Sequence, residues 1–67
     1  MTGHFKCRIA PSETFAVILT RRLFSDRQMD FGTWMTPGYV FGVTEEELWI
    51  ANELLAPHGV QLIQEGV

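Results

Sequence analysis

The chain has 67 residues and a formal net charge of −3, and 46% of its residues are hydrophobic. This length allows one compact domain over residues 1–67, and the apolar content excludes a disordered chain. The single cysteine, Cys7, excludes an internal disulfide, and the longest apolar run, residues 15–19, is far shorter than the roughly 20 residues of a membrane-spanning helix. We therefore expect a cytoplasmic protein without a membrane segment, whose small core is supported by a larger partner or by homo-oligomerisation.

The first two segments predict a β-hairpin. Residues 4–9 alternate polar and apolar side chains, which is typical of a strand with one buried face. Residues 15–24 are rich in apolar and β-branched types, and the segment between the two carries turn chemistry. A register that pairs Ile9 with Phe15 also pairs Cys7 with Val17, so the apolar side chains of both segments share one face.

The next segment, residues 25–37, loses periodicity and is expected to be a loop rich in aromatic residues. We expect Phe31 and Phe41 to pack in the core, whereas Trp34 and Tyr39 are candidates for a partner-binding surface because their polar atoms favour contact with water or partners. Residues 39–43 follow as a short strand with Tyr39, Phe41 and Val43 on one side.

The clearest element is a helix over residues 45–56. Thr44 as N-cap and Glu47 three residues later form a capping box, and Pro57 with Gly59 ends the helix. Residues 60–65 then predict a last strand that pairs with the hairpin. The order of elements predicts an α+β fold, in which a small antiparallel sheet of about four strands (β-β-β-α-β) carries one helix on one face.

Trp49 is the first candidate for partner binding. At about 100° per residue the helix gathers Leu48, Ile50, Ala51, Leu54 and Leu55 on one side. Trp49 falls on the other side with the polar candidates Glu45, Glu46, Asn52 and Glu53. An exposed tryptophan ringed by polar groups is typical of an anchor for a protein partner. The alternative is that Trp49 folds over a neighbouring loop as ordinary packing.

A second candidate surface is basic. The predicted hairpin gathers His4, Lys6, Arg8 and Arg22 on its outward face, where basic residues can hold single-stranded nucleic acid. The acidic isoelectric point of about 5.1 and the lack of stacking aromatics on that face favour a solvated or helix-covered face instead. Nucleic acid is therefore the less favoured partner.

No catalytic, cofactor or metal site is predicted. His4 and Cys7 point to opposite faces of one strand, and phosphate-cradle and nucleophile fingerprints do not occur in the sequence. We expect a non-enzymatic inhibitor or modulator that binds the surface of a larger protein or complex. In size, lack of motifs and its helix–glycine–strand ending, the chain resembles the short inhibitors that phages encode against host machinery, such as anti-CRISPR proteins. Nucleic-acid binding through the basic face and a self-associating structural subunit remain the alternatives.

Charge is also divided along the chain. Residues 1–24 carry four basic residues and one acid, while residues 25–67 carry one basic residue and seven acids. A protein with one basic and one acidic part can bind an electropositive groove of a partner through its helix, or an anionic surface through its sheet.

Overall fold

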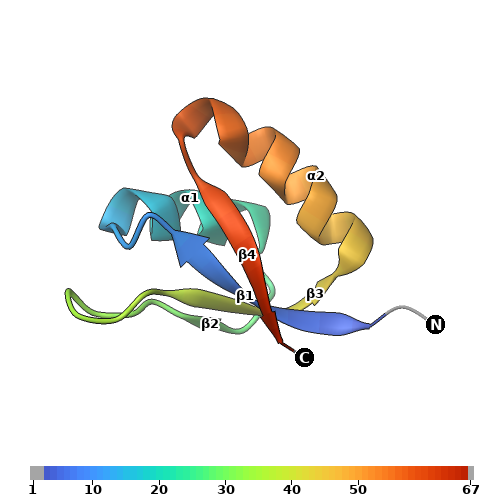
Figure 1. Cartoon of the computed structure of the whole chain (residues 1–67), viewed down its shortest axis with the longest axis horizontal. Helices are drawn as coiled ribbons and strands as arrows, with labels where there is room; N and C mark the ends of the chain where they lie inside the picture. Colours follow the sequence, from blue (N-terminus) through green and yellow to red (C-terminus); the bar gives the residue numbers. More distant parts are fainter. Residues whose placement is uncertain (1–2, 67) are drawn as a thin grey trace.

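The computed structural model describes residues 3–66 as one antiparallel sheet with two α-helices on one of its faces (Figure 1). The elements in chain order are β1 (His4–Ala10), α1 (Thr14–Leu23), β2 (Met29–Asp30), β3 (Tyr39–Thr44), α2 (Glu45–Leu55), the 3-10 helix η1 (Ala56–His58) and β4 (Gln61–Gly66). The strand order is β2-β3-β1-β4, and each neighbouring pair is antiparallel. This connectivity is the split β-α-β, or ferredoxin-like, arrangement. The predicted α+β class with a four-stranded antiparallel sheet is confirmed.

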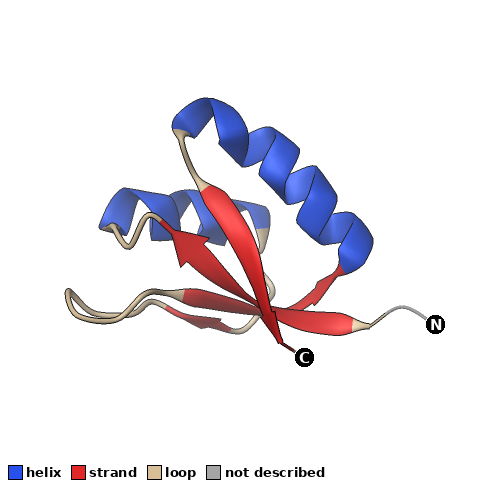
Figure 2. Cartoon of the chain, viewed as in Figure 1, coloured by secondary structure: helices blue, strands red, loops and turns tan. Residues whose placement is uncertain are grey.

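The prediction of a single helix is wrong, because most of the segment proposed as the second strand is helix α1. Its buried residues are Ala16, Val17 and Thr20, followed by buried Phe24, and this spacing is that of one helix face. The hydroxyl of buried Thr20 donates to the carbonyl of Ala16 at 2.8 Å, which satisfies a polar group inside the helix. The β-branched residues of this segment favour a strand, but the segment folds as a helix because a second helix is needed to cover the face of the sheet (Figure 2).

The predicted hairpin register is wrong for the same reason. Strand β1 is central and pairs with β3 and β4, so Ile9 lies opposite Leu62 and Cys7 lies opposite Val40 and Gln64. The inward orientation predicted for Cys7 and Ile9 is confirmed, since both are fully buried. The last strand was expected to pair with this hairpin, and it pairs with the only part of it that is a strand, β1.

Strand β3 departs from simple alternation at a β-bulge. Two residues, Phe41 and Gly42, face one residue of β1 between the pairs Phe5–Val43 and Cys7–Val40, and Gly42 has φ 72°. The bulge turns Val43 into the core beside Val40 instead of leaving it on the side of Tyr39 and Phe41. The expectation that Tyr39, Phe41 and Val43 share one side is therefore wrong.

The core lies between the sheet and the two helices. The buried apolar residues are Cys7, Ile9, Ala16, Val17, Phe24, Val40, Val43, Ala51, Leu55, Val60 and Leu62. Each helix contributes only two buried apolar side chains, so much of the outer surface of the helices remains open to other contacts.

The start of α2 is fixed as predicted. The Glu47 amide donates to the Thr44 hydroxyl at 3.2 Å, and the Thr44 amide donates to Glu47 Oε1 at 3.0 Å, which completes the capping box. Arg27, from the loop after α1, adds a forked ion pair to the same carboxylate and donates to the carbonyl of Gly42 at 2.8 Å. Glu47 and Arg27 thus join a loop, the bulge of β3 and the beginning of α2.

Candidate protein-interaction surfaces

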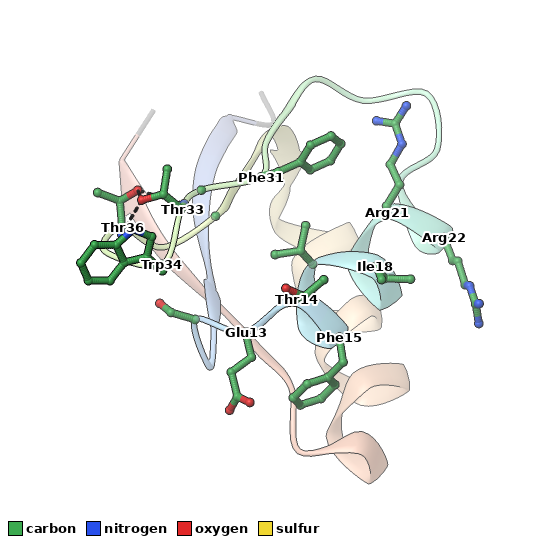
Figure 3. Close-up of a pocket in the computed structure, with 14 residues that line it drawn as sticks. Glu13, Thr14, Phe15, Ile18, Arg21, Arg22, Phe31, Thr33, Trp34 and Thr36 are labelled. Carbon is green, nitrogen blue, oxygen red and sulfur yellow. Dashed lines mark hydrogen bonds between the residues drawn. The ribbon is translucent and has the colours of Figure 1, made fainter.

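A groove of about 950 Å³ lies between α1 and the loop from residue 31 to residue 38 (Figure 3). We call it the α1–loop groove. Its lining residues are Ser12, Glu13, Thr14, Phe15, Val17, Ile18, Arg21, Arg22, Phe31, Gly32, Thr33, Trp34, Thr36 and Gly38. The groove therefore has aromatic and aliphatic walls, which is the usual character of a binding site.

The loop of this groove is held by its own hydrogen bonds. The side chains of Thr33 and Thr36 lie 3.0 Å apart, and the backbone amides of Thr33 and Thr36 each bond to the carbonyl of the other residue. The Gly32 amide donates to Asp30 Oδ1 at 2.9 Å. Gly32 has φ 72°, and a Cβ there would lie 2.6 Å from the Thr36 carbonyl oxygen, so the turn requires glycine.

This braced turn holds Trp34 away from the body of the protein. The side chain of Trp34 is 91% exposed, and that of the next residue, Met35, is 73% exposed. The predicted exposure of Trp34 is confirmed, and the prediction that Phe31 belongs to the core is wrong, because Phe31 is 60% exposed beside the groove. Thr33 and Thr36, on either side of Trp34 and Met35, are a sequence signal from which an ordered turn could have been predicted, since Thr side chains readily bond nearby backbone.

One end of the α1–loop groove is cationic. Arg21 and Arg22 occupy the last turn of α1, where a helix favours positive charge, and both line the groove. Arg21 donates to the Arg27 carbonyl at 3.1 Å, and neither Arg21 nor Arg22 forms an ion pair with another residue of the 3–66 range. The two guanidinium groups point in different directions at this end (Figure 3), so it presents positive charge on two sides.

The outer face of α2 is a second exposed surface. Trp49 is 67% exposed, as expected, but Ile50 and Leu54 are also 46% and 55% exposed, so the prediction that they belong to the buried side is wrong. The buried side of α2 is narrow and uses Ala51 and Leu55. We define the α2 surface as Trp49, Ile50 and Leu54 together with the exposed acids Glu45, Glu46 and Glu53.

Asn52 does not join that surface. Its side-chain Nδ2 donates to the Leu62 carbonyl at 3.1 Å, and its Oδ1 accepts from the Leu62 amide at 2.7 Å. The amide therefore pairs with the backbone of β4 as a neighbouring strand would, on the edge that β1 does not cover. The structure uses Asn52 to tie α2 to β4 and to occupy part of an open sheet edge.

The basic face proposed for nucleic acid is divided between two sides of the sheet. Lys6 and Arg8 lie on the open face, where Lys6 Nζ sits 4.9 Å from the ring centre of Tyr39 and Arg8 pairs with Glu65 at 3.0 Å. Arg22 lies on α1, on the face covered by helices, so the expectation that it joins Lys6 and Arg8 is wrong. With Arg8 neutralised, the open face has little positive charge to attract phosphate.

Tyr39 likewise lies apart from Trp34. Tyr39 is half-buried on the open face, with its ring centre 6.5 Å from that of Phe41, which is half-buried and outside the core. Trp34 belongs to the α1–loop groove, so the two aromatic residues predicted as one patch belong to different surfaces.

Burial and ion pairing shift the pKa values of Cys7 and Glu47. Burial raises the pKa of the Cys7 thiol to about 11, so this thiol is protonated and unreactive at neutral pH. The Arg27 guanidinium, followed by the Thr44 amide, lowers the pKa of Glu47 to about 2. Within residues 3–66 no three side chains of the His, Cys, Asp and Glu types lie close enough together to hold a metal ion.

Comparison with protein families, with characterised proteins and with solved structures found no significant match to this chain. Neither helix of the described range is both long and apolar enough to cross a bilayer.

Proposed function

We propose that this protein is a protein-interaction module that binds a segment of a partner protein in the α1–loop groove and modulates that partner by covering the segment. The observation that carries the proposal is Trp34, which is 91% exposed on a turn held by the Thr33 and Thr36 bonds. A tryptophan on an ordered turn loses little conformational freedom on binding, and tryptophan is enriched at binding hot spots.

The apolar surface next to Trp34 supports the proposal. Phe15 and Ile18 on α1 are 43% and 48% exposed, and Phe31 on the loop is 60% exposed, all lining the same groove. Exposed apolar residues gathered in one place are typical of an interaction site, whereas scattered ones are ordinary surface. The groove would bury these side chains against aromatic or aliphatic anchors of a partner.

The charges of the groove indicate which charges the bound segment of the partner carries. Because Arg21 and Arg22 lie at one end, the segment should carry carboxylates next to its apolar anchors. The free and buried state of Cys7 is compatible with a reducing compartment, and we propose the cytoplasm as the place of action.

The proposal is tested by affinity capture from a lysate of source cells, with and without nuclease treatment. Four proteins are compared: the wild type, Ile18→Asp in the wall of the groove, Trp34→Ser on the turn, and Lys6→Glu on the open face as a control. We expect one protein to be retained in stoichiometric amount by the wild type and by Lys6→Glu and to be lost with both groove variants. Equal retention by all four, or recovery that disappears with nuclease, would contradict the proposal.

A further inference from the structure

We infer that the α1–loop groove accepts the α2 surface of a second copy of this chain. The inference rests on the proposed function, because it names an occupant for the same groove. Both halves of the contact are visible in one molecule: an apolar groove with a cationic end, and an apolar helix face rich in acids.

The two halves of the contact are both apolar. On α2, Ile50 and Leu54 stand four positions apart, which is the spacing of anchors on a helix that lies in a groove, and Trp49 lies next to Ile50; all three are at least 46% exposed. On the groove side, Phe15 and Ile18 offer a comparable exposed stripe on α1. Packing the two stripes together would remove both from water.

The charged halves are complementary. Glu45 and Glu46 are exposed in the first turn of α2, and Glu47, the third acid of that turn, is engaged by Arg27. Arg21 and Arg22 are exposed in the last turn of α1. Opposite charges at the ends of two apolar stripes select one orientation, with the beginning of α2 against the end of α1.

That antiparallel orientation also brings the residues into register. A helix rises about 1.5 Å per residue, so Glu46, Ile50 and Leu54 are spaced by about 6 Å each. Along α1 the steps from Arg22 to Ile18 and from Ile18 to Phe15 are about 6 Å and about 4.5 Å. In this register Glu46 lies opposite Arg22, Ile50 lies opposite Ile18, and Leu54 lies opposite Phe15. The antiparallel helix dipoles add a favourable contribution.

The contact joins two different surfaces, so it is heterologous. A pair formed in this way still has one free groove and one free α2 surface, and further copies can add until a ring closes or a filament grows. This property provides a test that a symmetric dimer would not satisfy. A variant that lacks only one of the two surfaces can form a capped pair with a variant that lacks only the other.

The experiment measures molar mass by light scattering after size exclusion, from micromolar to millimolar protein. We expect the mass of the wild type to rise with concentration. Ile18→Asp, which damages the groove, and Trp49→Asp, which damages the α2 surface, should each remain monomeric with an unchanged circular dichroism spectrum. Their equimolar mixture should give a dimer and nothing larger.

A charge exchange provides a second, milder set of variants at fully accessible positions. Arg22→Glu and Glu46→Lys should each weaken self-association by roughly tenfold or more, and mixing them should restore it. Lys6→Glu changes the net charge as much as Arg22→Glu but lies on the opposite face of the sheet, so it should leave association unchanged. Equal loss with Lys6→Glu would show a general charge effect and overturn the inference.

The outcomes separate this inference from the proposed function. A wild type that stays monomeric at all concentrations, or a mixture of Ile18→Asp and Trp49→Asp that stays monomeric while the wild type associates, refutes docking of a second copy. If capture of a different protein still depends on Ile18 and Trp34 in that case, the proposed function stands. If the wild type does not self-associate and no other protein is captured through Ile18 and Trp34, both proposals are refuted.

Discussion

Replacing Asn52 with alanine tests whether this residue supports the fold or binds a partner. Asn52 makes two hydrogen bonds to the backbone of one residue, Leu62, which is 2% exposed. Alanine would leave the amide and the carbonyl of Leu62 without partners on a sheet edge. We therefore expect a loss of folding stability and no specific loss at the α2 surface.

The magnitude follows from the two groups left unpaired. A buried polar group that loses its partner costs about 1–3 kcal/mol, and access of water to the edge of β4 reduces the cost toward the lower limit. Two such groups give a loss of about 2–3 kcal/mol in the free energy of unfolding. For a domain of 67 residues, whose total stability is about 3–10 kcal/mol, this is a large fraction. It corresponds to a decrease in Tm of roughly 10–20 °C.

The assay is urea denaturation followed by circular dichroism, with two variants for comparison. Asn52→Asp keeps an acceptor for the Leu62 amide but turns a carboxylate oxygen toward the Leu62 carbonyl, and this repulsion should also leave it less stable than the wild type. Glu53→Ala changes an exposed neighbour on the same helix and should stay within about 0.5 kcal/mol of the wild type. If Asn52→Ala also stays within that range, the two bonds do not support the fold, and the structural role assigned to Asn52 is wrong.

Three further predictions concern the groove, the beginning of α2 and the turn that carries the exposed tryptophan. Trp34→Ala should leave Tm unchanged, because the side chain is 91% exposed, and should weaken partner binding by about 2 kcal/mol in a titration by calorimetry. The lowered pKa of Glu47, about 2 against an ordinary 4.5, means that its ion pair stabilises the fold above pH 4.5 and that this contribution is lost as the pH falls toward 2. Urea titrations should show Glu47→Gln less stable than the wild type by about 1 kcal/mol after solvent screening at pH 7, and by roughly half of that or less at pH 3. Gly32→Ala should cost clearly more stability than Gly59→Ala, since both glycines have a φ near 72° but only Gly32 lies against the Thr36 carbonyl; equal thermal melts would contradict the close approach.

The helix α2 and the strands β1, β3 and β4 were predictable from the sequence, because their signals are local. The capping box of Thr44 and Glu47 uses neighbouring residues, and the alternation in residues 4–9 needs no partner to be recognised. The α+β class followed from these elements alone. The surface position of Trp34 was expected from its turn-rich loop, whereas exposure of Trp49 was only one of two alternatives until the structure showed it.

The tertiary structure alone decided the identity of α1 and everything that depends on it. Residues 14–23 are apolar and β-branched enough for a strand, and they form a helix because the sheet face beside α2 must be covered. That change moves Arg22 away from Lys6 and Arg8, creates the α1–loop groove and leaves Ile18 exposed within it. Where local propensity is divided between helix and strand, long-range packing selects one of them. For this reason the sequence placed Arg22 on the wrong face of the sheet, and the α1–loop groove could not be predicted from it.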